Sequence, residues 1–569
     1  MKRTGAILTV LTMTLMLLFG TTLAYTPGEY TATAQGNNGP VEVKVTLDAD
    51  RITAVEVTKH SETPGIFETV FDTLPQQIVE RQTLAPDTIT GATVSRQALL
   101  DAVADAIVQA GGNPEALKDS TAPVAEDEAL TADVVVVGGG AAGIAAALEA
   151  HDAGAKVILL EKLAHLGGNT LISGGLIYGT GHTFQKEAGV EDSVEALVEY
   201  WYNRSGGTAD KALLTLVAEK SADTIAWLVD NGVVLGNLGT AGISPVPRMV
   251  GTGKGGGGFI LPLTEKLAER GIAVKLETPA THLLTEDGRI VGVQAQAKDG
   301  HKVTVRSARV VLATGGFDAS EQMKRKYAPC ASGEVCFSSP GNEGDGIRMA
   351  QEVGAATVFK DSVIGLRATR PTSFGDPANG LVWSPVLLVN AKGERILNEA
   401  VDYPIYHSKL VQDGSSHFYL IFDATQATAD QVAELIDQGF AFTADTLEAL
   451  AAKTFMDEGI FLNTVRRYNE LKGTPDADFG KDAALMTGVG EGPYVALRVI
   501  PTTIGTMGGI KIDLDMRVLD TNGAPIDNLF AAGACANGDF FGREYPASGT
   551  SIQMCFTTGR IAGKNAAAK

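Results

Sequence analysis

The sequence contains few of the residues that proteins use to hold metals or haem. Its 569 residues include eight histidines and four cysteines, which are Cys330, Cys336, Cys535 and Cys555. No two cysteines form a C-x-x-C pair and none stands in a C-x-x-C-H motif, so attached c-type haem is excluded and a metal–thiolate site is not expected. Cys330 and Cys336 lie close enough in sequence for a disulfide in an exported protein, and ordinary thiols are the alternative.

Positive charge is also scarce. The chain has 46 Lys and Arg residues against 67 Asp and Glu residues, which gives a formal net charge of −21. Such a chain has little to neutralise phosphates, so we expect no nucleic-acid partner. The acidic balance is compatible with a soluble protein of the cell envelope.

Long apolar runs are missing apart from one near the start. Lys2 and Arg3 precede an apolar run from Ala6 to Phe19, and small residues follow it as far as Ala24. A charged segment, an apolar segment and a small-residue cleavage site are typical of a secretory signal peptide. The run is shorter than the roughly 20 residues of a membrane-spanning helix. We therefore expect residues 1–24 to be a signal peptide cleaved after Ala24, with the protein exported to the periplasm or the outer face of the cell envelope; an uncleaved anchor is the alternative.

Residues 25–115 have the pattern of a small α+β domain. Residues 41–47 and 52–58 alternate apolar and polar side chains, as half-buried strands do, and a turn signal between them predicts a hairpin. The same reasoning predicts helices over Phe71–Arg81 and Arg96–Ala110, the second of which ends at a pair of glycines.

Glycine is abundant, and one cluster of glycines has a specific meaning. A wholly apolar strand that begins at Asp133 runs directly into Gly138, Gly140 and Gly143, a helix follows, and the next apolar strand ends at Glu161. A G-x-G-x-x-G turn in a βαβ unit, with an acid about 20 residues later, is the fingerprint of a dinucleotide-binding fold. The glycines turn the chain, admit a pyrophosphate and let the helix pack closely, while the acid accepts ribose hydroxyls.

Residues 87–93 resemble the flavinylation motif D-x-x-[ST]-G-A-[ST] of the FMN-binding domain family. The strands and helices of the surrounding segment, with His60 and the turn at 62–65, match that family as well. The resemblance implies that a flavin transferase joins the phosphate of FMN to the hydroxyl of Thr93. Thr93 precedes the second predicted helix, and a helix N-terminus favours a phosphate.

A second resemblance covers residues 131–569 and is to flavoproteins of the fumarate reductase and succinate dehydrogenase type. It rests on glycine-rich and polar segments that occur in the family order: 162–175, 310–317, 344–346, 389–399, 507–509, 529–533 and 558–563. One departure is Ala534, where the family often has Glu. The resemblance implies non-covalent FAD, held by Gly138, Gly140, Ala142, Gly143, Glu161, Lys162, Gly168, Asn169, Thr170, Ser173, Gly174, Gly175, Thr314, Gly315, Asp345, Gly533, Ser551 and Ile552.

The two resemblances together imply an α/β fold with three folded domains. A Rossmann-like FAD-binding domain holds an inserted α+β capping domain and follows the small α+β FMN-binding domain. We expect no metal site and see no internal repeat. The implied boundaries are a signal peptide at 1–24, the FMN-binding domain at 25–115, a flexible acidic linker at 116–130, the FAD-binding domain at 131–355 and 506–569, and the capping and substrate domain at 356–505.

Three positions depart from the fumarate reductases of the family. Gly505 stands where those enzymes have a carboxylate-binding His, Val382 stands at the proton-donor Arg, and Tyr545 falls near the second carboxylate-binding Arg. Because a dicarboxylate needs cationic partners, these departures argue against fumarate as the substrate. Residues 545–552 look more like the branch that acts on ketosteroids and related unsaturated carbonyl compounds.

Tyr545 is therefore the leading candidate for an acid, a base or a carbonyl-polarising group, and a packing role is the alternative. Arg367 and Arg370 are candidates to bind an anion or donate a proton, against the alternative of solvated surface charges. The weaker candidates are Tyr403, Tyr406, His407, Arg543 and Glu544.

The sequence leads to three functional hypotheses. The first is an exported ene-reductase that takes electrons from an external donor, a membrane quinol or a redox protein, and passes them through FMN on Thr93 to FAD. FAD would then reduce an activated C=C bond in an unsaturated carbonyl or carboxylate compound, with steroid-like compounds included. The second is a reductase of small acids such as fumarate, urocanate or aryl-acrylates. The third is an electron-transfer flavoprotein without alkene turnover.

Overall fold

The computed structural model describes residues 25–62, 67–85, 93–118, 125–241, 243–369, 379–542 and 544–568. The predicted signal peptide, residues 87–92 of the flavinylation motif, Arg370 and Arg543 lie outside these ranges. The described chain divides into two compact units. The smaller unit comprises residues 25–61, 71–85 and 96–118, and the larger comprises the chain from residue 125 onward together with the short pieces 62, 67–70 and 93–95.

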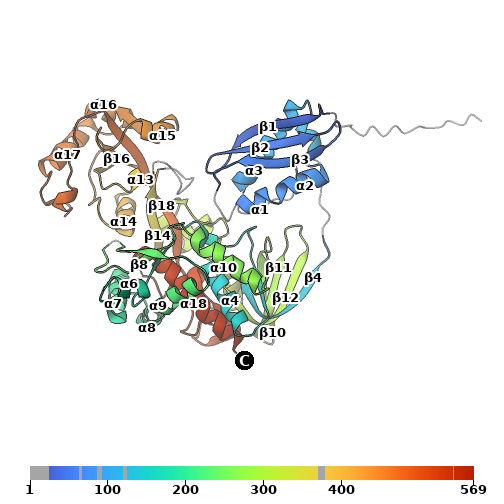
Figure 1. The fold of residues 1–569 in the computed structure, drawn as a ribbon. Helices are drawn as coiled ribbons and strands as arrows, with labels where there is room; N and C mark the ends of the chain where they lie inside the picture. Colours follow the sequence, from blue (N-terminus) through green and yellow to red (C-terminus); the bar gives the residue numbers. More distant parts are fainter. Residues whose placement is uncertain are drawn as a thin grey trace, which may run out of the picture. The chain divides into compact units, whose positions relative to one another are not determined.

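The smaller unit is built on a three-stranded antiparallel sheet of β1 (Gly28–Gln35), β2 (Pro40–Leu47) and β3 (Ile52–Lys59) in that order. Every second residue of β2 is buried, from Val41 to Leu47, which is the period-two pattern seen in the sequence. The predicted hairpin is confirmed, since β2 and β3 pair antiparallel. β1 is not among the predicted elements and adds an outer strand (Figure 1).

The helices of this part differ from the prediction mainly at their ends. Two short helices, α1 (Phe67–Phe71) and α2 (Leu74–Arg81), stand where the pattern predicts one helix over 71–81. Pro75 lies in the first turn of α2, where its missing N–H costs no hydrogen bond. The second helix, α3 (Thr93–Gln109), starts three residues before the predicted Arg96.

The larger unit centres on a sheet whose parallel core strands come from distant parts of the chain. β4 (Glu128–Val137) pairs parallel with both β5 (Val157–Leu160) and β12 (Lys302–Leu312). The last four residues of β4, all valines, are buried on both faces, as parallel strands between helices are. The remaining strands of this sheet are β9 (Ala273–Lys275), β10 (Ala280–Glu286), β11 (Arg289–Gln296), β19 (Arg517–Leu519) and β20 (Pro525–Ala531).

The start of β4 corrects the predicted linker. The composition of residues 116–130 predicts a flexible segment, but β4 begins at Glu128, and its first residues pair with Val303–Ser307 of β12. A short 3-10 turn at Pro114–Leu117 precedes it. The N-terminal half of β4 alternates between half-buried and exposed residues. The acidic composition of residues 116–130 therefore did not indicate a strand.

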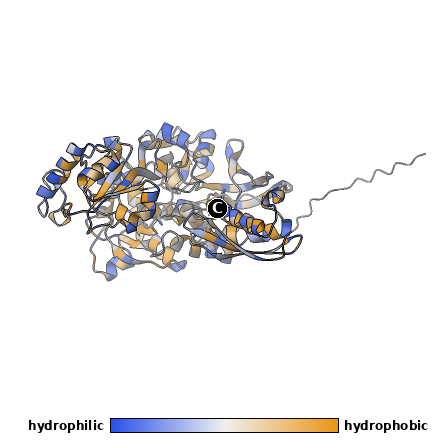
Figure 2. Cartoon of the chain, turned by 90° about the horizontal axis from the view of Figure 1, so that it is seen from above, coloured by the Kyte–Doolittle hydropathy of each residue, from blue (hydrophilic) through white to orange (hydrophobic). Residues whose placement is uncertain are grey.

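Two helices pack tightly beside this sheet. α4 (Ala141–Asp152) follows the glycine turn, and α18 (Thr550–Ala567) comes from the far end of the chain. At Gly559 of α18 a Cβ would stand 2.3 Å from the carbonyl oxygen of Ala142, so only glycine permits this approach. Hydrophobic and hydrophilic residues are interspersed along the helices (Figure 2).

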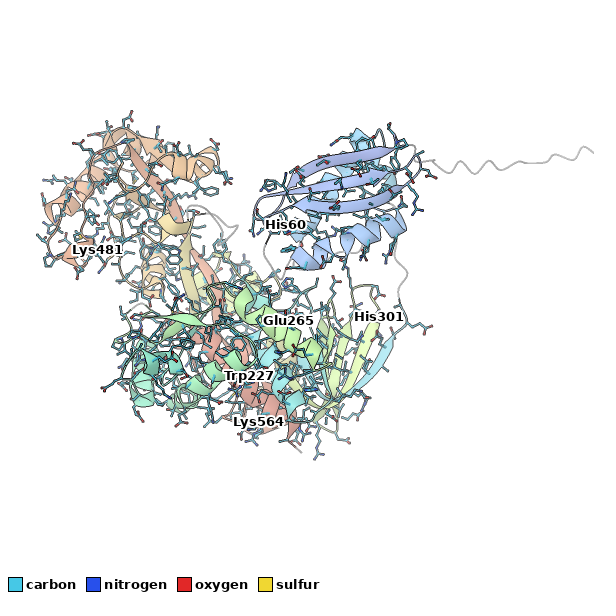
Figure 3. The ribbon with its side chains drawn as sticks, viewed as in Figure 1. His60, Trp227, Glu265, His301, Lys481 and Lys564 are labelled. Atoms are coloured by element: carbon cyan, nitrogen blue, oxygen red, sulfur yellow. The ribbon has the colours of Figure 1, made fainter. Side chains whose placement is uncertain are left out.

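A second sheet is formed mostly, but not wholly, by residues 357–510, and its two longest strands, β14 (Thr357–Ala368) and β18 (Tyr494–Ile510), pair antiparallel. β18 continues through the boundary expected at 505/506 without a break. Helices α14 (Tyr403–Asp413), α16 (Leu447–Thr454) and α17 (Glu458–Glu470) belong to this part, as does Lys481, labelled in Figure 3. The other strands of this sheet are β13 (Val335–Cys336), β15 (Leu388–Asn390), β16 (Phe418–Phe422) and β17 (Ala441–Ala444). Among the described residues, no helix has the length and apolar character that a membrane span needs.

Candidate active site

The glycine turn after β4 adopts the geometry that the fingerprint predicts. Gly138 has a φ of +102°, in the region that favours glycine. A Cβ on Gly143 would stand 1.8 Å from the carbonyl oxygen of Gly138, so any side chain there would force the turn open. Gly140 caps the N-terminus of α4, the end of a helix at which a phosphate is stabilised.

Glu161 closes the same end of the site from the tip of β5. Its carboxylate accepts hydrogen bonds from the N–H groups of Gly139 and Leu163, each at 2.7 Å. Burial raises the pKa of this carboxyl, and the two N–H donors oppose that rise. Its neighbour Lys162 pairs with Asp345 at 2.8 Å and with Glu343 at 2.6 Å.

Glu161, Lys162 and Asp345 line a cavity of about 580 Å³ in the larger unit. Its volume lies in the range of small-molecule and cofactor sites. Fifteen of the predicted FAD-binding residues line it: Gly138, Gly140, Ala142, Glu161, Lys162, Gly168, Asn169, Thr170, Ser173, Gly174, Thr314, Gly315, Asp345, Ser551 and Ile552. Gly143, Gly175 and Gly533 do not line it, because each is packed against neighbouring atoms behind the wall.

The polar wall of the cavity includes three residues that the sequence reasoning missed. Asp318 is 1% exposed, and burial raises the pKa of its carboxyl. The Asn342 amide donates to it at 3.4 Å and the Thr506 hydroxyl at 3.5 Å. Asp318 directly follows the Gly-Gly-Phe of a family motif, so its position was the available signal, but only the fold brings Asn342 and Thr506 to it.

Tyr545 lies at the other end of the cavity. It is 4% exposed, and its hydroxyl oxygen accepts a hydrogen bond from the N–H of Ser551 at 2.9 Å. Ser551 is in the first turn of α18, where N–H groups have no partner within the helix. Burial raises the pKa of the Tyr545 hydroxyl. The predicted leading candidate therefore lies in the cavity wall, and burial favours the protonated form of its hydroxyl.

Tyr403 stands beside Tyr545, with the ring centroids 6.1 Å apart. Burial raises the pKa of Tyr403, neighbouring Tyr545 raises it further, and the Ser548 hydroxyl hydrogen-bonds to it and opposes the rise. Trp383 packs edge-on against Tyr403, with centroids 6.3 Å apart. The rest of this end is apolar or small and is lined by Ile364, Leu366, Ile504 and Gly505.

Arg367 does not reach the cavity. Its Nε donates to the Val382 carbonyl at 2.6 Å, and its guanidinium lies 3.6 Å from the centre of the Tyr406 ring. The side chain is buried, and burial lowers its pKa. Its contacts favour a packing role. His407 pairs with Glu334 at 3.0 Å, and neither His407 nor Tyr406 is among the cavity-lining residues.

Acidic residues outnumber basic residues in the described cavity wall. Of the described residues that line it, Lys162 is the one cation, and it is paired at the ribose end. The carboxyl groups of Glu161, Asp318 and Asp345 also line the cavity. The described tyrosine end thus offers aromatic and hydroxyl groups and no cation for a carboxylate.

The predicted FMN attachment residue lies in another part of the chain. Thr93 is the first residue of α3 and is exposed. Two residues on, the buried Ser95 hydroxyl donates to the buried carboxylate of Glu62. Attachment of FMN to Thr93 stays a prediction.

The cysteines do not form the disulfide that was one alternative. All four are free, so a Cys330–Cys336 bridge is wrong for this structure. Cys336 instead lies 2.7 Å from the Ser338 hydroxyl and close to Asp318. Within the described ranges, no group of His, Cys, Asp or Glu side chains is arranged to hold a metal ion.

Comparison with known families gives a match to an N-terminal stretch of the chain and another to most of the remainder. Residues 133–552 match the family described as FAD binding domain, which is well over half of the chain. Residues 36–108 match the family described as FMN-binding domain.

Two relatives and one solved structure illustrate these matches. The chain is 33% identical over 562 residues to a urocanate reductase of Eggerthella lenta, covering 95% of this chain and 92% of the relative. It is 31% identical over 556 residues to an NADH:fumarate oxidoreductase of Klebsiella pneumoniae, covering 95% of this chain and 59% of that longer protein. It is 30% identical to the structure of a 3-ketosteroid-Δ4-(5α)-dehydrogenase from Rhodococcus jostii in complex with 4-androstene-3,17-dione, with a TM-score of 0.64 and coverage of 79% of this chain and 99% of that one.

Proposed function

Because the chain belongs to the family of FAD-binding flavoproteins that includes fumarate and urocanate reductases, we propose that it is a flavin-dependent ene-reductase. Its substrate in this proposal is an α,β-unsaturated carbonyl compound, with steroid-like enones included. The observation that carries the proposal is the placement of Tyr545: its hydroxyl oxygen accepts the Ser551 N–H while its proton can be given to a substrate in the cavity.

The described residues fit FAD. The glycine turn presents backbone without side chains at the N-terminus of α4, which suits a pyrophosphate. Glu161 would hold the ribose hydroxyls, and the wall from Asn169 to Gly174 would hold the ring. When bound, FAD supplies two electrons as a hydride. The protein supplies the place, the orientation and the proton.

Tyr545 is suited to protonate the carbon next to the carbonyl. Addition of hydride at the β-carbon leaves negative charge on the α-carbon and the carbonyl oxygen, so a nearby acid lowers the barrier. The Ser551 N–H, at the N-terminus of α18, stabilises the phenolate that remains after the proton has left. Burial raises the pKa of Tyr545 and so destabilises the phenolate. The phenolate must therefore regain a proton before the next turnover.

The charge at the tyrosine end favours a neutral carbonyl substrate over a dicarboxylate. Moving a neutral polar group out of water without a hydrogen-bond partner costs ~2–7 kcal/mol of free energy. An ionised carboxylate without a cationic partner costs more than that. Among the described lining residues there is no cation at this end, whereas a carbonyl needs only a hydroxyl or N–H donor. The match to a steroid dehydrogenase structure supports an apolar, ring-shaped substrate.

The electron supply is a further part of the proposal. Thr93 would carry FMN through its hydroxyl after the action of a flavin transferase, and electrons would enter from an external donor, a membrane quinol or a redox protein. The name of the Klebsiella relative adds NADH as a donor to test. Export by the segment 1–24 is proposed on its sequence pattern alone.

Two other functions are kept. A reductase of small acids is favoured by the relatives, which are named for urocanate and fumarate. An electron-transfer flavoprotein is favoured if no alkene oxidises the reduced protein.

The decisive experiment is anaerobic reoxidation of the dithionite-reduced protein by a panel of enones, a Δ4-3-ketosteroid, fumarate, urocanate and an aryl-acrylate. We expect the enones or the steroid to restore the oxidised flavin spectrum fastest, with the saturated product found by mass spectrometry. Faster reoxidation by fumarate or urocanate would replace the first proposal with the second. Failure of every alkene, with both flavins bound, would leave the electron-transfer function.

A further inference from the structure

Asp402 is a buried carboxyl directly behind the tyrosine end of the cavity. It is the N-cap of α14 and 8% exposed, and its Oδ1 accepts the N–H of Tyr403 at 2.9 Å. Its other oxygen, Oδ2, is buried and has no hydrogen-bond partner among the described residues. A buried carboxyl oxygen without a partner is rare in folded proteins and calls for an explanation.

Arg204, in the last turn of α7 (Val194–Arg204), faces the same region. Its Nη1 pairs with Glu544 at 3.1 Å, whereas Nε and Nη2 are buried with no hydrogen-bond partner in the described chain. Asp402 thus has one buried acceptor, and Arg204 two buried donors, without a partner in the described chain.

The charges around Asp402 act on the tyrosines that line the cavity. The carboxylate of Asp402 raises the pKa of Tyr403, Tyr545 and the half-buried Tyr200. Asp402 itself has a pKa raised to about 6, first by burial and then by Glu544, while the Tyr403 N–H and Arg204 oppose the rise. Within the described chain, the charged and titratable groups coupled to Asp402 through their pKa values are thus Arg204, Glu544 and the three tyrosines.

Solvent reaches this group from one side. The Glu544 side chain is 39% exposed, while that of Arg204, to which it is paired, is 11% exposed. Tyr403 and Tyr545 form the cavity wall on the other side. Glu544, which acts on the pKa of Asp402, is thus exposed to solvent, and the two tyrosines line the cavity.

We propose that Asp402, whose carboxyl accepts the N–H of Tyr403, is the proton relay that recharges Tyr403 and Tyr545 after each substrate has been protonated. The proposal rests on the ene-reductase function. In each turnover the Tyr545 O–H bond breaks as a C–H bond forms at the substrate α-carbon. The carboxyl of Asp402 then gives its proton to the phenolate, directly or through Tyr403, and the Asp402 carboxylate takes a proton from solvent. One hydride from FAD and one solvent proton enter the product.

Asp402→Asn separates this role from the capping of α14, because Asn and Asp are equally good N-caps. Asp457→Asn is the matched control: Asp457 caps α17 by accepting the N–H of Ile460 at 2.9 Å, far along the sequence from the tyrosines. The three full-length proteins, loaded with FAD, are supplied with an enone and an excess of reduced viologen dye across a pH series, and the multiple-turnover rate is followed by the oxidation of the dye.

We expect the wild-type turnover rate to fall as the pH rises through about 6, because Asp402 then loses the proton it delivers. Asp402→Asn should turn over roughly 10- to 100-fold more slowly and lose that pH dependence. Asp457→Asn should match the wild type.

A wild-type rate and pH profile in Asp402→Asn would overturn the relay. So would a slow variant that keeps the wild-type pH profile, since that is the result of a structural role. Failure of all three proteins to react with any alkene would refute the ene-reductase function, and the relay with it.

Discussion

Replacing Tyr545 with Phe tests the step on which the proposed mechanism depends. The substitution removes one oxygen atom from a side chain that is 4% exposed and leaves the ring packing against Tyr403 and Phe541 unchanged. If Tyr545 donates the proton, its loss should slow reoxidation of the reduced protein by an enone about 10²- to 10⁴-fold. That factor corresponds to ~3–5 kcal/mol of transition-state stabilisation. kcat and kcat/KM should fall together, because the interaction is made in the transition state.

The same substitution has a calculable effect on stability. The Ser551 N–H loses its acceptor, and an unpartnered buried donor costs about 1–3 kcal/mol of unfolding free energy. Tyr406→Phe is the matched control, because the Tyr406 hydroxyl is buried and has no hydrogen-bond partner among the described residues. Its ring, which stacks on Arg367, is retained. We expect Tyr406→Phe to keep both activity and stability.

The assays are anaerobic stopped-flow reoxidation, followed at the flavin absorbance, and denaturant unfolding of the same samples. Dithionite reduction should be equally fast in all three proteins, which shows that FAD is bound. The reasoning is refuted if Tyr545→Phe reacts at the wild-type rate, or if Tyr406→Phe loses as much activity as Tyr545→Phe.

Three further predictions concern the cofactor sites. Gly143→Ala should abolish FAD binding, because its Cβ would stand 1.8 Å from the Gly138 carbonyl oxygen. Gly236→Ala, whose Cβ would meet nothing within 4 Å, should keep the wild-type flavin-to-protein ratio. Equal ratios in the two variants would contradict the turn geometry. Thr93→Val should lose the mass of FMN from the peptide that contains residue 93 when the protein is made with a flavin transferase, and a modified variant peptide would disprove the assignment. Burial raises the pKa of Asp318, so its contribution to stability declines as the pH rises from the unfolded-state pKa of about 4 towards the higher folded-state pKa. Asp318→Asn should therefore gain stability relative to the wild type as the pH rises from about 4 to 7 in denaturant unfolding; a constant difference would show that Asp318 does not titrate on folding.

Part of the candidate site follows from local sequence alone. The run of valines before Gly138, the spacing of Gly138, Gly140 and Gly143, and the acid at Glu161 specify a strand, a turn and a helix within a few tens of residues. Each requirement is steric or hydrogen-bonded over a short range, so the pattern predicts the structure. Fifteen of the predicted FAD-binding residues accordingly line one cavity.

The substrate end could not be read in the same way. Arg367 is an obvious candidate among the charged residues, but the fold turns its guanidinium onto the Tyr406 ring. Tyr403 is a weaker candidate by sequence, yet α14 places it beside Tyr545 in the cavity wall. Alternate residues of a strand face opposite sides of the sheet, and the orientation of a helix is set by its packing. The sequence therefore could not show whether Arg367 in β14 or Tyr403 in α14 faces the cavity.

The sequence by itself determined the cofactor framework, because nucleotide-binding turns and strand patterns are local. It also indicated that Gly505 stands at the family's carboxylate-binding His and Val382 at its proton-donor Arg. The tertiary structure alone decided which charged and polar residues meet in the described chain. Asp318, Asn342 and Thr506, and likewise Asp402, Arg204 and Glu544, come from segments far apart in the chain. Their meeting depends on long-range packing, which buries Asp318 and Asp402 and so raises the pKa of both carboxyl groups.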